Sequence, residues 1–363
     1  MKTLSLLRFI AACTFVSAIF GCKKDSQLPA FQLHDLSITT TRQNNQIIDL
    51  ETIASATETI QLDTNEQAPI LGVINNLYEC QDFLYIIADG CLYRYDKTGK
   101  FDIKIGAKGR GPGEYLYISS ISTNQTDESI NLFDVTTQSL LKYDNEGNYL
   151  SKNEIKPNET YTYLRSFFPY NNSLIFGTLS NSVIPNIYIA NPSTNEFRQI
   201  SKQEREMEEG EVIMGSSILF GDPSKPLIYN YFNDTIYTIS NNTLQPQFLA
   251  KGKELRMGFE MLTLEKLAEV SGTYLQMNNI VKFGDNLLFF YTLSQLEGQK
   301  RVPILSLYQT TTNTYRQNIT ISDKSGQITI TSRDKVVQGP TSNQITIVKE
   351  NNQLIHCTTT PPK

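Results

Sequence analysis

The stretch FLYIIADGCLYRYDKTGKFDIKIG, residues 83–106, decides the fold class. It contains an apolar run, a polar turn, a second run that ends in Tyr95-Asp96, a tight turn that ends at Gly99, and a third run. Short runs rich in Ile, Leu, Tyr and Phe, separated by Asp- and Gly-containing turns, are typical of antiparallel strands. The stretch therefore predicts a three-stranded meander.

The same order of features returns in INLFDVTTQSLLKYDNEGNYLSKNEI, residues 130–155. Asp96 and Gly99 are each followed 48 residues later by a counterpart, Asp144 and Gly147. Blades of β-propellers repeat about every 40–50 residues. In such turns the Asp carboxylate accepts a hydrogen bond from the N–H two residues on, and the Gly takes a positive φ. The two Asp residues are therefore interpreted as turn formers.

Weaker copies of this pattern occupy residues 173–190, 226–240, 286–309 and 343–359. Together with the first two copies they predict an all-β fold, a six-bladed β-propeller. The last copy lacks a fourth strand, and ETIQLD at residues 58–63 is available to supply it. We therefore expect the ring to close by pairing of the N- and C-terminal strands, which removes exposed sheet edges.

One segment, residues 254–270, departs from the strand pattern. It is rich in Leu, Met, Glu and Lys and has no β-branched run. This composition predicts a short helical insertion. The insertion either covers a binding site or fills space, and the sequence leaves both alternatives open.

The first 21 residues have the features of a lipoprotein signal peptide. Lys2 and Arg8 flank the start of an apolar run that ends in Gly21-Cys22. The alternative is a transmembrane anchor, but the run is short for a bilayer span, which needs about 20 residues. We expect Cys22 to carry lipid, residues 22–45 to form a flexible tether, and residues 46–363 to form one propeller domain. The expected location is the cell envelope of a Gram-negative bacterium, at the outer membrane.

The charge of the chain argues against one class of partner, whereas its cysteines say little about function. The chain has 32 Lys and Arg against 37 Asp and Glu, and removal of Lys2 and Arg8 with the signal peptide lowers its formal charge from −5 to −7. A nucleic-acid partner is not expected, because binding to phosphates needs clustered cations. Three further cysteines, Cys80, Cys91 and Cys357, are expected to be buried free thiols.

The segment YRYDKTGKFDIKIGAKGRGPGEY, residues 93–115, resembles a family of bacterial six-bladed β-propeller lipoproteins related to NHL-repeat propellers. It shares with them the strand, the Asp-x-x-Gly turn and the Gly-x-x-Gly-x-Gly-Pro-Gly-Glu-Tyr loop. TIQLDTNEQAPILGVINNLYE, residues 59–79, is similar to the segment that opens their first blade. The resemblance implies the propeller fold and an envelope location. It implies little chemistry, since most of that family has no established activity.

The glycine-rich loop GAKGRGPGEY, residues 106–115, lacks the features of a nucleotide-binding loop. Gly113 is followed by Glu114 and a strand-like run, not by Lys-Ser/Thr and a helix. In a propeller the loop is expected to cross from an outer strand to the next inner strand, which explains its glycines. The crossing would also bring Lys108 and Arg110 near the central channel to meet an anionic ligand, with Glu114 paired to either cation. The architectural and ligand-binding interpretations both stay open.

Other candidate site residues are sparse. The tyrosines expected at the starts of inner strands, which would face the channel and suit stacking against a sugar, are Tyr115, Tyr117, Tyr161 and Tyr163. His34 and His356 are far apart, so neither a histidine metal site nor a general base is indicated, and no cofactor is expected. A calcium site in the channel would use Glu79, Asp89 and Asp134, although each also fits a strand-end turn.

The combined prediction is a non-enzymatic binding or interaction module held in the envelope by lipid. Its expected partner is a small ligand, a glycan or an envelope protein, and the protein is expected to be a monomer that meets the membrane only through its lipid. The alternative is a metal-dependent propeller hydrolase or lyase with its site at the central channel.

Overall fold

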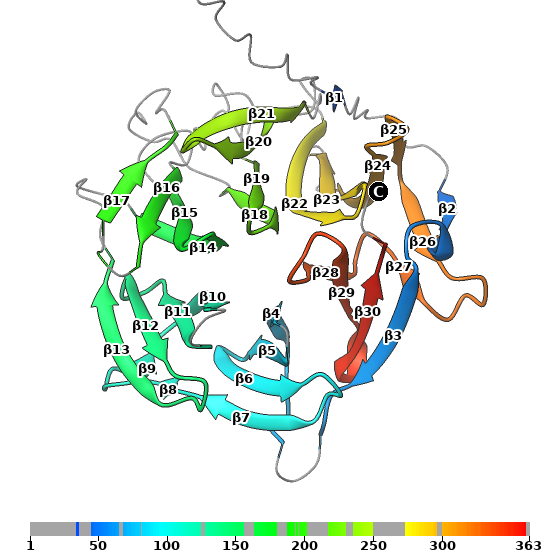
Figure 1. Cartoon of the computed structure of the whole chain (residues 1–363). Helices are drawn as coiled ribbons and strands as arrows, with labels where there is room; N and C mark the ends of the chain where they lie inside the picture. Colours follow the sequence, from blue (N-terminus) through cyan, green and yellow to red (C-terminus); the bar gives the residue numbers. More distant parts are fainter. Residues whose placement is uncertain are drawn as a thin grey trace, which may run out of the picture. The chain divides into compact units, whose positions relative to one another are not determined.

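A computed structural model describes residues 34–35, 45–64, 68–80, 82–124, 128–155, 163–179, 187–192, 194, 196–201, 217–229, 235–249, 273–295 and 300–360. Within the unit of residues 33–363, these residues form mainly antiparallel sheets arranged in a ring (Figure 1). The described ranges contain no α-helix, only the 3-10 turns η1 (Leu50–Thr52) and η4 (Glu350–Asn352). None of the described segments is a helix of the length and apolarity that crossing a membrane requires.

The two repeats are neighbouring four-stranded meanders, which confirms the strand pattern predicted from the sequence. The first contains β4 (Ile74–Glu79), β5 (Phe83–Ala88), β6 (Cys91–Asp96) and β7 (Phe101–Ile105). The second contains β10 (Ile118–Thr123), β11 (Ile130–Asp134), β12 (Ser139–Tyr143) and β13 (Tyr149–Glu154).

The tight turns of both meanders have the predicted chemistry. Asp96 Oδ1 accepts hydrogen bonds from Thr98 N at 2.8 Å and Lys100 N at 3.0 Å, and Gly99 has a φ of 91°. In the second meander Asp144 Oδ1 accepts from Glu146 N at 3.0 Å, and Gly147 has a φ of 86°. Both carboxylates are therefore engaged in their own turns.

Four further sheets continue around the ring. They contain β14 (Tyr163–Tyr170), β15 (Ser173–Leu179), β16 (Ile187–Asn191) and β17 (Glu196–Gln199); β18 (Ile218–Asp222), β19 (Lys225–Tyr229), β20 (Thr235–Ser240) and β21 (Thr243–Leu249); β22 (Thr273–Phe283), β23 (Asn286–Gln295), β24 (Lys300–Gln309) and β25 (Thr314–Gln317); and β28 (Lys335–Gln338), β29 (Gln344–Val348) and β30 (Gln353–Thr358) with β3 (Ala56–Gln61). The first strands contact one another in the order β10, β14, β18, β22, β28 and β4.

The prediction of a six-bladed propeller is wrong, because the described residues form seven sheets of three or more strands. The additional sheet contains β26 (Ile319–Ser322), β27 (Thr329–Ile330) and β2 (Gln46–Asp49), and it lies at the outer rim of the ring (Figure 1). Its β27 has two residues, and its third strand comes from the other end of the chain, so no local repeat marks it. The helical insertion expected at residues 254–270 lies outside the described residues.

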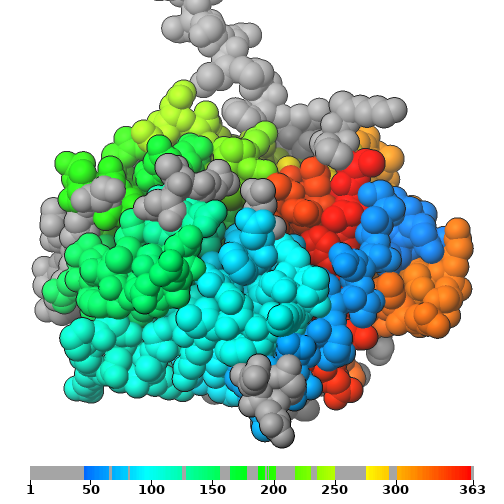
Figure 2. All heavy atoms as spheres, turned by 60° about the horizontal axis from the view of Figure 1, so that its bottom comes forward, coloured from blue at the N-terminus to red at the C-terminus, as the bar shows by residue number. Residues whose placement is uncertain are grey.

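The N-terminal segment adds an outer strand to three sheets. β3 pairs antiparallel with β30, which is the pairing expected between the two ends of the chain. β2 pairs parallel with β26, and β1 (His34–Asp35), which falls within the expected tether, pairs parallel with β21. In Figure 2 the blue segment lies between the cyan first meander, the red last sheet and the orange segment that includes β26. These pairings cover strand edges that would otherwise be open to association.

The core lies between the faces of neighbouring sheets. One cluster joins Ile87 and Leu92 of the first meander to Ile121, Leu132 and Leu141 of the second. The apolar face of each strand pattern therefore packs against the next sheet, and the polar turns and loops are left at the ends of the strands.

Candidate functional site

The glycine-rich loop is held by hydrogen bonds at the outer part of the ring. Its ends pair as two short parallel strands, β8 (Ala107–Lys108) and β9 (Glu114–Tyr115). Inside the loop the Glu114 carboxylate accepts a hydrogen bond from Gly111 N at 2.7 Å. Gly106 has a φ of 60°, and a Cβ there would lie 2.6 Å from the Tyr143 hydroxyl oxygen. The glycine at this position is required both for the backbone angle and for close packing.

Tyr115 is a core residue of this loop and does not face a channel. Its side chain is fully buried. Its hydroxyl donates to Ile105 O at 2.9 Å and accepts from Leu92 N at 3.1 Å. Burial raises the pKa of this phenol above its ordinary value. Tyr115 therefore ties the loop to the first meander, and its ring is not accessible to a ligand.

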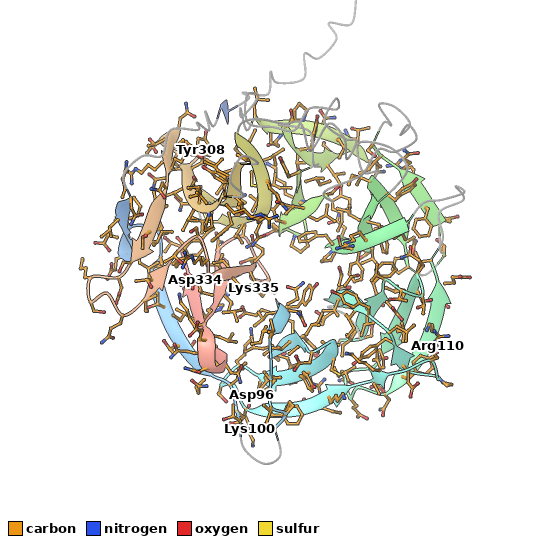
Figure 3. All side chains as sticks on the ribbon, turned by 180° about the vertical axis from the view of Figure 1, so that it is seen from behind. Asp96, Lys100, Arg110, Tyr308, Asp334 and Lys335 are labelled. Atoms are coloured by element: carbon orange, nitrogen blue, oxygen red, sulfur yellow. The ribbon has the colours of Figure 1, made fainter. Side chains whose placement is uncertain are left out.

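The loop does not carry its cations to the centre of the ring. Figure 3 places Arg110 on the outer side, away from the central opening. Lys108 is exposed and lies against the β5–β6 turn, since a Cβ at Gly90 would lie 2.6 Å from Lys108 Cε. Neither cation is paired with Glu114 among the described contacts. The β8–β9 pairing and the Tyr115 hydrogen bonds explain this, because they close the loop on itself and hold it against β6 and β7.

The structure instead brings Arg110 together with residues that the sequence analysis did not select. A pocket of about 350 Å³, called the Arg110 pocket below, is lined by Arg110, Leu116, Thr136, Thr137 and Lys152. Lys152 lies on β13, and the two threonines belong to the β11–β12 turn. No carboxylate is paired with either cation in the part of the chain that is described. The pocket therefore offers two positive charges that have no counterion among the described residues.

One hydroxyl group of this pocket lacks a partner. Thr137 Oγ1 is buried and makes no hydrogen bond to any described residue. A buried hydroxyl without a partner costs about 1–3 kcal/mol. A ligand atom that reached this hydroxyl and paired with it would remove that cost.

Asp134 stabilises the backbone around the pocket, and its carboxylate is not available to a ligand or metal. Its side chain is fully buried. Its carboxylate accepts hydrogen bonds from Leu116 N at 2.9 Å, Tyr117 N at 3.1 Å and Thr136 N at 3.0 Å. These bonds join the loop to the β11–β12 turn and hold the pocket walls in place.

The remaining candidates that the structure describes are not lining residues of this pocket. Tyr117 is 57% exposed, whereas Tyr161 and the side chain of Tyr163 lie outside the described residues. Asp89 accepts a hydrogen bond from Gly72 N at 2.9 Å. Glu79, Asp89 and Asp134 are each engaged by protein groups on different elements. Throughout the described ranges, no three His, Cys, Asp or Glu side chains are grouped as metal ligands.

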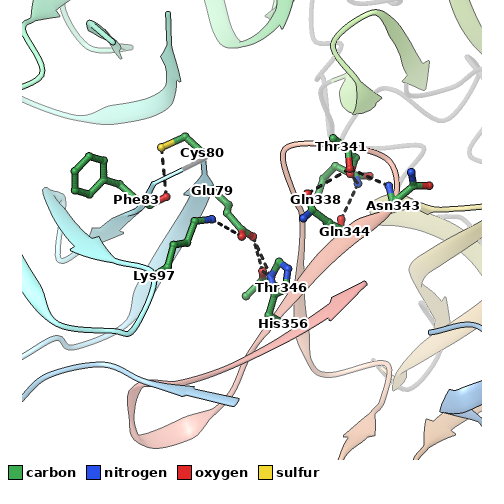
Figure 4. A network of polar contacts seen from close by, with 10 residues as sticks. All are labelled: Glu79, Cys80, Phe83, Lys97, Gln338, Thr341, Asn343, Gln344, Thr346 and His356. Carbon is green, nitrogen blue, oxygen red and sulfur yellow. Dashed lines mark hydrogen bonds and ion pairs between the residues drawn. The ribbon is translucent and has the colours of Figure 1, made fainter. Parts of the chain in front are cut away.

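Glu79 belongs to a buried network that joins the first meander to the last sheet (Figure 4). Its side chain is 4% exposed, and Oε1 pairs with Lys97 Nζ at 2.6 Å. Oε2 lies 3.1 Å from His356 Nδ1 and accepts a hydrogen bond from Thr346 Oγ1 at 3.1 Å. Burial alone would raise the pKa of Glu79, but the hydrogen bonds from His356 and Lys97 together hold it below its usual value.

The network does not have the geometry of a catalytic relay. In such a relay the carboxylate and the nucleophile contact opposite nitrogens of the imidazole. Here Glu79 and Thr346 both face His356 Nδ1, with Thr346 Oγ1 at 3.2 Å. The arrangement is that of a bridge between two sheets. The sequence analysis did not bring Glu79 and His356 together, although the expected closure of the ring makes their sheets neighbours.

Comparisons with known proteins agree with this fold. Residues 34–361 match the profile of a family described as a domain of unknown function, DUF4934. No curated protein matches the sequence. The chain is similar in structure to a protein described as exported from Bacteroides fragilis, with a TM-score of 0.62, 13% identity, and 88% of this chain and 99% of that one covered. It is also similar to a DUF4221 family member from Bacteroides vulgatus, with a TM-score of 0.53, 9% identity, and 84% and 96% covered.

At these identities the two solved structures bear on the fold alone. Both similarities extend over most of each chain. The family match covers all of the described sheets, from β1 to β30. The chain belongs to the DUF4934 family.

Proposed function

We propose that this protein is an exported, lipid-anchored propeller that acts as a binding module for an anionic ligand at the Arg110 pocket. The observation that carries the proposal is the convergence of Arg110, Lys152 and the unpartnered Thr137 hydroxyl on one pocket. Two cations that have no counterion in the described part of the chain favour an anion, and the Thr137 hydroxyl would supply a neutral hydrogen-bonding group beside them. The hydrogen bonds of the buried Asp134 and the pairing of β8 with β9 fix the backbone around the pocket. The backbone that carries Arg110 is therefore held in place.

The export and anchoring part of the proposal has separate support. The signal-peptide pattern ends in Gly21-Cys22, and a structurally similar protein is described as exported. Metabolic labelling with an alkyne fatty acid is expected to mark the wild-type protein and not Cys22→Ser. Labelling of the Cys22→Ser variant would contradict a lipid at this residue. Membrane fractionation then tests the outer-membrane location.

The ligand proposal is tested by titrating the full-length mature protein, in detergent, with inorganic phosphate and following heat by calorimetry. Saturable binding is expected. Arg110→Ala and Lys152→Ala each remove one charge-assisted hydrogen bond, which corresponds to about ten-fold weaker binding. Lys100→Ala, an exposed cation in the β6–β7 turn, is the matched control and is expected to bind like the wild type.

Thr137→Val gives the sharpest distinction between binding and folding. It removes the unpartnered hydroxyl and keeps the side-chain shape, so the free energy of unfolding is expected to stay the same or rise. Phosphate affinity is expected to fall at the same time. If each of the three single variants, Arg110→Ala, Lys152→Ala and Thr137→Val, bound phosphate as tightly as the wild type, the proposal would be overturned.

A further inference from the structure

A second and larger pocket lies at the outer rim, where the N-terminal segment meets the additional sheet. Its volume is about 690 Å³. Its walls come from β24, from β26, from the turn after β27 and from Asn45, which precedes β2. Asn45 is the lining residue that comes from the N-terminal segment, and the pairing of β2 with β26 holds it beside the pocket.

Two arginines give this pocket its charge. Arg301 on β24 and Arg333 in the turn after β27 both line it, and Arg333 is exposed. No described carboxylate is paired with either guanidinium. The neighbouring Asp334 does not neutralise them, because its Oδ1 pairs with Lys349 Nζ and its Oδ2 accepts a hydrogen bond from Thr331 N at 2.7 Å. The pocket therefore holds two guanidinium groups that no described carboxylate neutralises, and such groups suit carboxylate, phosphate or sulfate oxygens.

The rest of the lining suits a hydroxylated ligand. Amide and hydroxyl side chains stand beside the arginines, among them Asn318, Thr320 and Ser332, with Val302 and Pro303 as apolar surface. The volume falls in the range of about 300–1,000 Å³ that is typical of small-molecule sites. A lone inorganic anion would fill only a small part of it. The site matches an organic anion with neutral polar groups around its charge.

We propose that the Arg301–Arg333 pocket binds an organic anion of about the size of a monosaccharide. The guanidinium groups of Arg301 and Arg333 hold its carboxylate, phosphate or sulfate, and the amide and hydroxyl side chains hold its neutral polar groups. This site is separate from the Arg110 pocket, with which it shares no lining residue.

Occupancy of the pocket also stabilises the attachment of the N-terminal segment. Asn45 Nδ2 donates to Thr320 Oγ1 at 3.1 Å, and Gln46 N donates to Asn318 O at 3.1 Å. A ligand that contacts both Asn45 and β26 makes its contact with Asn45 only while β2 is paired with β26. By linkage, binding to the paired state lowers the frequency with which β2 detaches. The ligand is thus coupled to the segment that leads toward Cys22.

The test uses glucuronate as the probe, with glucose and inorganic phosphate as comparison ligands, on the full-length mature protein in detergent. Calorimetry is expected to show saturable glucuronate binding, with glucose at least ten-fold weaker because it lacks the charge. Phosphate is expected to be weaker than glucuronate at this site, since it leaves the polar lining unfilled. Glucose binding as tightly as glucuronate, or phosphate binding more tightly at this site, would overturn the proposal.

Variants assign the binding to this pocket. Arg301→Ala and Arg333→Ala are each expected to weaken glucuronate at least ten-fold, whereas Arg165→Ala, an exposed arginine on β14, is the control. Arg110→Ala is expected to bind glucuronate like the wild type. The proposal for the Arg301–Arg333 pocket can therefore be tested even if the proposal for the Arg110 pocket fails. Normal glucuronate affinity in the Arg301→Ala, Arg333→Ala double variant would overturn it.

Hydrogen exchange supplies a readout of the coupling. Saturating glucuronate is expected to slow exchange of the amides of residues 46–49, and not of residues 139–143 in β12. Unchanged exchange at residues 46–49 at saturation would overturn the coupling of ligand to β2.

Discussion

At the scale of single residues, Glu79 shows how one side chain joins two sheets that are distant in sequence. Its two oxygens are divided between Lys97 of the first meander and the Thr346–His356 pair of the last sheet. Asp96 shows the opposite case, since its carboxylate serves only its own turn. The role of Asp96 was predictable because its partners lie within four residues. The role of Glu79 was not, because its partners are set by ring closure.

Glu79→Gln is expected to lower the free energy of unfolding at neutral pH by about 1–3 kcal/mol, since it removes the charge that pairs with Lys97 and His356. The pKa of Glu79 is lower in the folded protein than in the unfolded chain. Its contribution is therefore present above the unfolded pKa, 4.5, and is lost as pH falls through the folded pKa. Urea unfolding at several pH values should show the wild type and variant converging in acid.

Glu350→Gln serves as the control for Glu79→Gln. Glu350 is exposed in η4, so its substitution is expected to change stability by less than about 0.5 kcal/mol at any pH. If the free energy of unfolding of Glu79→Gln stayed below that of the wild type by the same amount down to acidic pH, a role for the ionised carboxylate would be contradicted.

At the scale of elements, the turn between β6 and β7 is fitted against the end of β3. Gly99 has a φ of 91°, and a Cβ there would lie 2.3 Å from Gln61 O. Asp63 N donates to Gly99 O at 2.8 Å, and Phe101 N donates to the Asp63 carboxylate at 3.2 Å. The turn glycine thus also sets how closely the N-terminal strand can approach the first meander.

Gly99→Ala is expected to be more destabilising than Gly326→Ala by about 1–3 kcal/mol, the usual cost of overpacking. Gly326 has a φ of 73°, but a Cβ added there would meet no atom within 4 Å, so its substitution reports the cost of the backbone angle alone. Thermal or urea unfolding of the two variants measures the difference. Equal losses of stability in the two variants would show that the close approach of Gln61 O adds no cost to a side chain at position 99.

The sequence predicted elements well where they repeat locally. The runs at 83–88, 91–96 and 101–105 are the strands β5, β6 and β7, and the turns between them have the expected Asp and Gly geometry. It missed β2 and β27, because a parallel strand from a distant segment and a two-residue strand leave no periodic pattern. Both pockets were missed for the same reason, since their cations converge from separate elements. Only Arg110 was selected, and its expected place in the channel was wrong.

At the scale of the whole molecule, the closure of the ring depends on the register between β3 and β30. Thr57 is the Cα partner of Cys357, and Glu58 is the partner of His356. Partners across an antiparallel pair lie about 4.5–5.5 Å apart, within the range that a disulfide spans. The register can therefore be tested by a covalent bond.

Thr57→Cys is expected to form a disulfide with Cys357, whereas Glu58→Cys, whose side chain points to the other face, is not. Burial raises the pKa of the Cys357 thiol to about 12, so oxidation is best carried out during refolding, while the thiol is accessible. Peptide mapping without reductant identifies the bond. Bonding of Cys357 in Glu58→Cys and not in Thr57→Cys would show a register shifted by one residue.

The pairing of β3 with β30 also determines when the protein can finish folding. The last sheet takes one strand from residues 56–61 and three from residues 335–358, so it cannot assemble until almost the whole chain has been synthesised. Contacts between such distant segments form slowly, because a long loop must close before they become favourable. The early meanders can form beforehand, each with a face still uncovered. The nascent chain is therefore expected to depend on chaperones, and the completed ring to be reached in one late, cooperative step.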